Sequence, residues 1–153
     1  MIFSSVSCGD EKGYGHAELI IQLDEGFKKT KNDSYDKTYT NGTEVIALRR
    51  ISFVAGAASG IPETLMPKAF GELWLEKCGR ESIFLNTSPA GVAYCTYYEG
   101  VGDDEVFYLE AFYRTPYAYF VILCAAPGSQ SVESRVKFIS IIDSADIKKT
   151  KDG

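Results

Sequence analysis

Apolar and polar positions alternate most clearly in the second half of the chain. Four segments there are rich in β-branched and aromatic residues, and turns containing glycine, proline or asparagine separate them. They span residues 82–86, 92–98, 105–114 and 117–126. Because antiparallel strands can be joined by tight turns, this pattern predicts an antiparallel meander.

The first third of the chain predicts two more strands. Residues 17–23 place Leu19, Ile21 and Leu23 on one face, and residues 44–54 form an apolar segment. The polar residues 24–43 between them predict a long surface loop or an irregular hairpin that turns at Asn41-Gly42.

Two segments have a helical period. After a small-residue loop at 55–60, Pro62 or Pro67 suits a first helical position, and Gly79 suits the end. Apolar residues between them recur at helical spacing: Phe70, Leu73, Trp74 and Cys78. The second helix follows Pro127 and has an apolar stripe of Val132, Val136 and Ile139, widened by Phe138, Ile141 and Ile142.

These elements predict an α+β fold: a single domain over residues 1–153, with an antiparallel sheet of five to seven strands and two main helices. We expect a polar N-terminal segment at 1–16 and a solvated C-terminal tail at 148–153. The expected core includes Trp74, Phe120, Ile122, Val136 and Ile139.

Charge narrows the choice of partners. The chain has a net charge of −5, and residues 81–134 hold seven acidic side chains against one basic side chain, Arg114. This balance disfavours nucleic acid and anionic membranes as partners, and no apolar run is long enough for a membrane span. The acidic segment is either a solvated face or a docking surface for a basic partner.

The four cysteines form no CxxC pair, so no metal site or thioredoxin motif is predicted. Free buried thiols are one interpretation, and a Cys95–Cys124 disulfide is the first candidate if any pair is oxidised.

Residues 5–8 are similar to the end of a bacterial lipoprotein signal. A lipid-anchored envelope protein trimmed at Cys8 is therefore a further hypothesis.

The order strand–strand–helix–four strands–helix over residues 44–147 resembles the PsbP-like fold. The resemblance rests on the segment YFVILCAAPGS and on a terminal helix ending KFISIIDSADI. This fold occurs in photosystem extrinsic proteins, small bacterial lipoproteins and secretion-system immunity proteins. The resemblance implies binding, since the family has no common catalytic site.

Catalytic candidates are few. His16 is the only histidine and lies in a polar, glycine-rich segment. Glu110 shares a strand face with Tyr108 and Phe112, so it is either a cross-strand partner or a carboxylate in an aromatic groove with a perturbed pKa. A small hydrolase or lyase using Glu110 or His16 with tyrosines is the alternative function.

The favoured hypothesis is a non-catalytic protein-binding domain without metal or cofactor, such as a toxin-neutralising immunity protein or an accessory subunit. A periplasmic or secreted location is favoured over the cytoplasm. The hairpin at 97–108 is the predicted surface for a basic protein partner, because acids cluster there between tyrosines. Its residues are Tyr97, Tyr98, Glu99, Asp103, Asp104, Glu105 and Tyr108.

Overall fold

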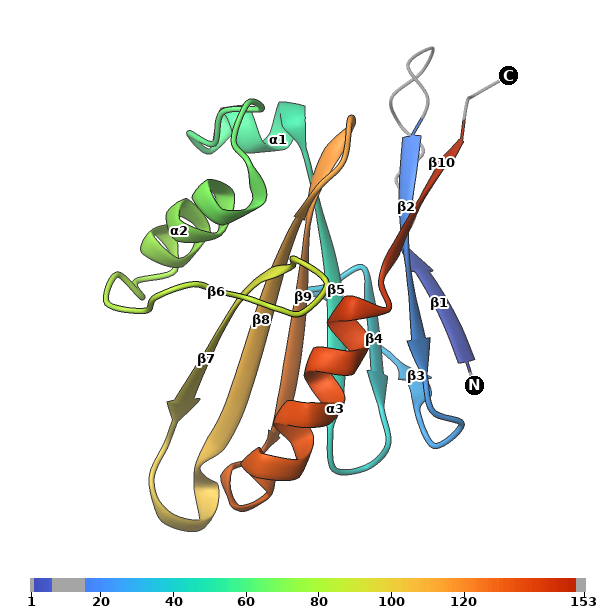
Figure 1. The fold of residues 1–153 in the computed structure, drawn as a ribbon, viewed down its shortest axis with the longest axis vertical. Helices are drawn as coiled ribbons and strands as arrows, with labels where there is room; N and C mark the ends of the chain where they lie inside the picture. Colours follow the sequence, from blue (N-terminus) through green and yellow to red (C-terminus); the bar gives the residue numbers. More distant parts are fainter. Residues whose placement is uncertain (1, 7–15, 151–153) are drawn as a thin grey trace.

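A computed structural model describes residues 2–6 and 16–150, with side chains placed for residues 17–148. The described chain forms two antiparallel sheets (Figure 1). The smaller has the order β1-β2-β10: β1 Ile2–Val6, β2 His16–Leu23 and β10 Asp146–Thr150. The larger has the order β3-β4-β5-β9-β8-β7-β6: β3 Lys28–Thr30, β4 Lys37–Thr40, β5 Val45–Ser52, β6 Asn86–Thr87, β7 Ala93–Glu99, β8 Val106–Arg114 and β9 Ala118–Pro127.

Helices pack on both faces of the larger sheet. On one face, α2 (Pro67–Lys77) contacts β7 and β8, preceded by the short α1 (Phe53–Ala58). On the other face, α3 (Ser131–Asp143) contacts β8 and β9 and also β2 of the smaller sheet. Two 3₁₀ turns complete the chain, η1 (Gly102–Asp104) and η2 (Gly128–Gln130). The predicted α+β class, with one domain and two main helices, is confirmed.

Each face of the larger sheet has its own apolar core. The core under α3 joins both sheets and includes Phe120, Ile122 and Phe138. The core under α2 is smaller and includes Phe70, stacked on Tyr119 with 4.1 Å between ring centroids. Because strand side chains alternate between faces, β8 and β9 contribute to both cores and lie almost wholly buried.

The meander is confirmed from β7 to β9. Tyr94 pairs with Ala111, and Ala111 with Ile122, in continuous antiparallel ladders. The strand predicted at 82–86 is wrong, since only Asn86–Thr87 pairs with β7. In the residues before it, Ile83 and Leu85 pack against the smaller core without forming a strand.

The face of α3 that packs inward differs from the predicted stripe. Val136, expected in the core, is 70% exposed, while Phe138, Ile141 and Ile142 are buried. The inward face carries the largest apolar side chains of α3, and buried Ser134 on the same face donates a hydrogen bond of 2.6 Å to Glu44, just before β5. Of the other expected core residues, Phe120 and Ile122 are fully buried, and Trp74 and Ile139 are half-buried.

For residues 24–43, the hairpin alternative is confirmed: β4 pairs with β5 across a turn that contains Asn41 and Gly42, and β3 pairs with β4. Two further segments differ from their predicted structure. The small-residue loop at 55–60 is largely the helix α1, which begins where the Ser52 hydroxyl accepts the Ala55 N–H at 3.0 Å. Residues 148–150, expected in a tail, belong to β10 and pair with β2.

The interpretation of Cys95 and Cys124 as free buried thiols is confirmed, and the pairing considered for the oxidised case does not occur. Both thiols are free and buried. Cys95 belongs to the core under α2 and Cys124 to the core under α3. The two side chains therefore lie on opposite faces of one sheet, where no disulfide can join them. Cys8 lies outside the described residues.

Candidate functional site

The β7–β8 hairpin holds the predicted binding residues at one end of the larger sheet (Figure 1). Gly100 in its loop has a φ of +84°, and a Cβ at this position would lie 2.7 Å from the carbonyl oxygen of Asp104. The Gly128 N–H donates to the Glu105 carbonyl at 2.8 Å, which ties the loop to the turn before α3. The positive φ of Gly100 and this hydrogen bond together fix the conformation of the loop.

The tyrosines of the hairpin divide between the two faces of the sheet. Tyr97 and Tyr108 stack on the α2 face with 5.2 Å between ring centroids. Tyr98 lies on the opposite face, 52% exposed, with its ring 5.3 Å from that of Phe107. The predicted set is therefore not one continuous aromatic patch.

The four acids of the hairpin also differ in environment. Glu99 forms an ion pair with Arg80, and Glu105 is half-buried. Asp103 and Asp104 in η1 are exposed and have no ion pair to any described residue. Asp103 and Asp104 are thus the exposed acids of the hairpin that lack an ion pair with a described residue.

A groove of about 400 Å³ runs beside these aspartates. The starts of β5 and β8 and the end of β9 form its sides, with the lining residues Thr43, Val45, Asp103, Asp104, Glu105, Val106, Ala125, Ala126 and Pro127. An apolar floor next to carboxylates suits a lysine or arginine side chain, which has an aliphatic stem and a charged head.

Glu110 is the carboxylate with the most altered environment on the α2 face. It is 7% exposed and accepts hydrogen bonds from the Tyr97 hydroxyl at 2.9 Å and from the Trp74 Nε1–H at 3.0 Å. Burial raises the pKa of Glu110, and the two hydrogen bonds oppose that rise. The aromatic surroundings match the alternative interpretation of this residue, but each oxygen already has a partner.

Two further side chains bear on catalysis: the Cys95 thiol and His16, the second catalytic candidate from the sequence. Burial raises the pKa of the Cys95 thiol to about 12, so it stays protonated at neutral pH. His16 begins β2 with its backbone opposite Thr150, and its side chain lies outside the described residues. Among the described residues, no group of three or more His, Cys, Asp and Glu side chains is placed to hold a metal ion.

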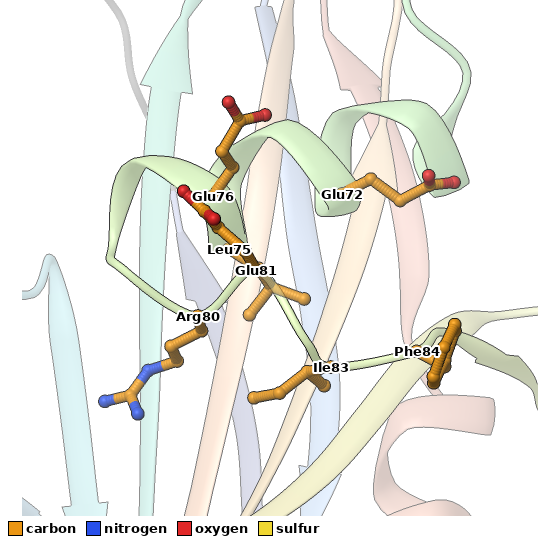
Figure 2. Close-up of a pocket in the computed structure, with 7 residues that line it drawn as sticks. All are labelled: Glu72, Leu75, Glu76, Arg80, Glu81, Ile83 and Phe84. Carbon is orange, nitrogen blue, oxygen red and sulfur yellow. The ribbon is translucent and has the colours of Figure 1, made fainter.

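A second acidic recess, missed at the level of sequence, lies between α2 and the segment after it. Figure 2 shows Glu72 and Glu76 of α2, with Glu81 and Phe84, around a cavity of about 350 Å³. Phe84 is 87% exposed. The only signal in the sequence is the i, i+4 spacing of Glu72 and Glu76, which places both on one helix face.

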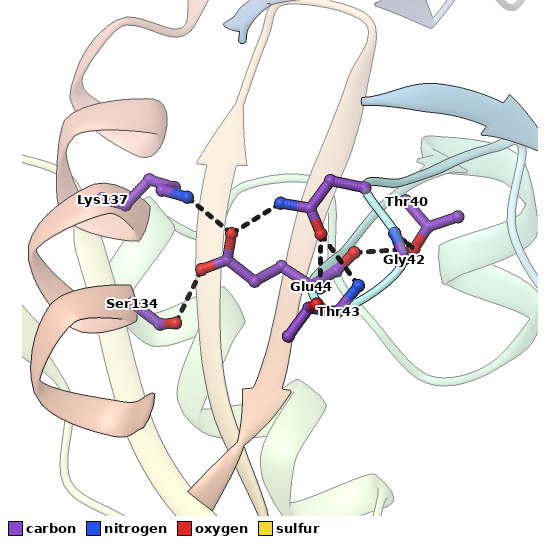
Figure 3. Close-up of polar contacts among 7 residues, drawn as sticks. Thr40, Gly42, Thr43, Glu44, Ser134 and Lys137 are labelled. Carbon is purple, nitrogen blue, oxygen red and sulfur yellow. Dashed lines mark hydrogen bonds and ion pairs between the residues drawn. The ribbon is translucent and has the colours of Figure 1, made fainter. Parts of the chain in front are cut away.

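Glu44 is the other buried carboxylate, and its contacts are structural. Its oxygens accept hydrogen bonds from Ser134 at 2.6 Å, Lys137 at 2.7 Å and Asn41 at 2.9 Å (Figure 3). Burial acts to raise the pKa of Glu44, but these three donors outweigh it and hold the pKa below its ordinary value. The network joins the β4–β5 turn to α3.

Comparisons with known proteins add little. No protein-family model and no curated protein matches the sequence. A solved structure, that of LpqN, involved in cell envelope biogenesis of Mycobacterium tuberculosis, superposes with a TM-score of 0.47 at 7% identity, covering 97% of this chain and 92% of that chain. Similarity at this level supports no argument about function.

In the described part of the chain, no helix is both long and apolar enough to cross a membrane.

Proposed function

We propose that this protein is a non-catalytic binding domain that recognises a basic partner protein through the β7–β8 hairpin. The observation that carries the proposal is the pair of exposed, uncompensated aspartates, Asp103 and Asp104, beside an apolar groove. The carboxylates steer a positively charged partner towards the groove, and the apolar floor contributes contact area after docking.

The groove fits a lysine or arginine side chain, which makes a basic segment the preferred ligand. An immunity protein that neutralises a basic toxin and an accessory subunit of a basic protein both use such a surface. A periplasmic or secreted location belongs to the same proposal, as does the PsbP-like resemblance, which implies binding without chemistry. The lipid-anchored alternative depends on Cys8 and stays a prediction.

The proposal is tested by changing Asp103, Asp104 and Glu105 together to Ser. We expect association with a basic partner, recovered by co-purification, to slow by about tenfold and to lose most of its dependence on salt. Stopped-flow kinetics at several ionic strengths measure both quantities. A control variant with Asp24, Asp33 and Glu133 changed to Ser removes the same charge elsewhere and should associate faster than the first. Equal rates for the two variants would contradict the proposal.

A further inference from the structure

The outer side of β7 is largely unpaired. Among the described residues, its neighbour on that side is β6, which pairs with Tyr94 and Ala93 and extends no further. Residues 95–99 therefore form an open edge of the larger sheet (Figure 1). An open edge is a template for a strand from another chain.

The direction of the unpaired backbone groups follows from the turn before β7. The Ser88 N–H donates to the Val92 carbonyl at 2.9 Å, so the backbone groups of Val92 face β6. Because these groups alternate along an antiparallel strand, those of Thr96 and Tyr98 face the same way. Two N–H donors and two carbonyl acceptors are thereby directed outward.

The two edges of the larger sheet differ in how they are protected. The opposite edge, β3, is three residues long and carries Lys28 and Lys29, both exposed. Short length and lysine are devices that prevent edge pairing. Residues 95–99 contain no lysine, proline or glycine. The β7 edge therefore lacks the protection found at β3.

Charge beside the edge indicates what covers it. Arg80 lies over the Tyr97 ring at 4.4 Å and is paired with Glu99, and it also lines the cavity with Glu72, Glu76 and Glu81. Beside this part of the edge, on the α2 face, carboxylates outnumber the one guanidinium that contacts β7, since Glu99 pairs with Arg80 and three further glutamates line the cavity. On the other face, the edge presents Thr96 and the exposed ring of Tyr98. A second copy of this acidic chain would be repelled, whereas a basic strand would be attracted.

We propose that the β7 edge binds an extended basic segment of the partner as an additional β-strand. Its lysine or arginine side chains face the carboxylates beside α2, and its apolar side chains face Thr96 and Tyr98. This inference rests on the proposed function and specifies the mode of binding: backbone hydrogen bonds at the edge supply affinity, and alternating side chains supply specificity.

The test uses a synthetic heptapeptide, Lys-Val-Lys-Val-Lys-Val-Lys with capped ends, and the ¹⁵N-labelled protein. We expect the peptide to shift the amide resonances of residues 95–99 and 80–84 and to slow exchange of the Thr96 and Tyr98 amides. The same peptide with N-methylated valines keeps its charge but lacks the N–H groups of those residues, and it should bind at least about tenfold more weakly.

Variants test the protein side of the same contact. Thr96→Pro removes an outward N–H at an edge position where proline is tolerated, and it should weaken peptide binding by about tenfold. Thr96→Val keeps that N–H and should bind as the natural protein does. The N-methylated peptide tests the proposal on the unmodified protein, so the result does not depend on the folding of Thr96→Pro.

Three outcomes overturn the inference. Equal binding of the plain and N-methylated peptides, with shifts confined to residues 102–105, leaves basic recognition intact but excludes strand addition. Absence of any shift at millimolar peptide contradicts both the strand addition and the proposed function. If sedimentation velocity shows a dimer, and Thr96→Pro abolishes that dimer, then the edge binds a second copy of this chain.

Discussion

At the scale of single residues, the two buried glutamates have opposite effects on stability. Three donors surround Glu44, so its charged form is favoured and its pKa is lowered. Glu110 has two neutral donors, and burial outweighs them, so its protonated form is favoured and its pKa is raised. The same side chain thus stabilises the fold at one site and opposes it at the other at neutral pH.

Glu44→Ala should lower the free energy of unfolding by about 1–3 kcal/mol at neutral pH, because buried Ser134 loses its acceptor. The pKa of Glu44 is lower in the folded state, so its contribution is present above the ordinary carboxyl pKa and is lost as the pH falls through the folded value. The difference between the variant and the natural protein should therefore shrink in acid, as measured by urea unfolding across pH. Glu76→Ala, on an exposed face of α2, is the charge-matched control and should change stability little.

Glu110→Gln should raise the stability of the fold at neutral pH, whereas Glu44→Ala should lower it. The amide can accept from Trp74 and donate to the Tyr97 oxygen, so the local contacts are kept. Because the pKa of Glu110 is raised in the folded state, the natural protein loses stability as the pH rises from the ordinary carboxyl pKa through the folded value. The variant should gain stability relative to the natural protein over that range in thermal unfolding. If the stability difference between Glu110→Gln and the natural protein did not change with pH, the raised pKa of Glu110 would be contradicted.

At the scale of elements, α2 approaches the sheet closely because of one glycine. A Cβ on Gly71 would lie 2.6 Å from the Phe112 ring and 2.9 Å from Leu85. Gly71 lies in the middle of α2, where glycine is otherwise unfavourable for a helix. The close approach explains why it is there, and it positions Trp74 within reach of Glu110.

Gly71→Ala should destabilise the fold by about 1–3 kcal/mol, because the added methyl displaces α2 from Phe112. Gly56→Ala in α1 is the matched control, since its Cβ would meet neighbours at an ordinary 3.5 Å and helix propensity favours alanine. Chemical denaturation measures both variants. If the two variants were equally stable, the sheet would accommodate the methyl group that Gly71→Ala adds without loss of stability, which would contradict the prediction.

At the scale of the whole molecule, α3 connects the two sheets. It covers β8 and β9 on one side and contacts β2 on the other, and it buries Phe138, Ile141 and Ile142 between them. No other described element covers this face as a helix. α3 therefore contributes to the packing of the smaller sheet on the larger one, together with a direct contact between β1 and β5.

A chain ending at Pro127 should lose cooperative unfolding. It lacks three large buried side chains, each worth about 1.5–3 kcal/mol, and their sum approaches the whole stability of a domain, about 5–15 kcal/mol. Calorimetry measures the transition. The double variant Val132→Ser and Val136→Ser keeps α3 and alters only its exposed side, so it should retain the transition within about 0.5 kcal/mol. A sharp transition in the truncated chain would contradict the assigned role of α3.

The sequence by itself determined the elements whose signal is local. The meander from β7 to β9 has turns and apolar alternation within a few residues, and α2 begins at Pro67 and ends before Gly79 as its caps indicate. The charge of residues 81–134 also belongs to the sequence, as does the acidic loop between two strands. These features depend on residues close together in the sequence and need no contact between distant parts of the chain.

Tertiary structure decided what depends on contacts between distant residues. The inward face of α3 depends on such contacts, because Phe138, Ile141 and Ile142 pack between the two sheets and Ser134 bonds to Glu44, ninety residues earlier. The pairing of β10 with β2 joins segments more than a hundred residues apart, so no local pattern reveals it. The partners of Glu110, the open edge of β7 and the separation of Cys95 from Cys124 likewise follow from strand order. Strand order is fixed by long-range pairing, which the linear pattern of residues does not encode locally.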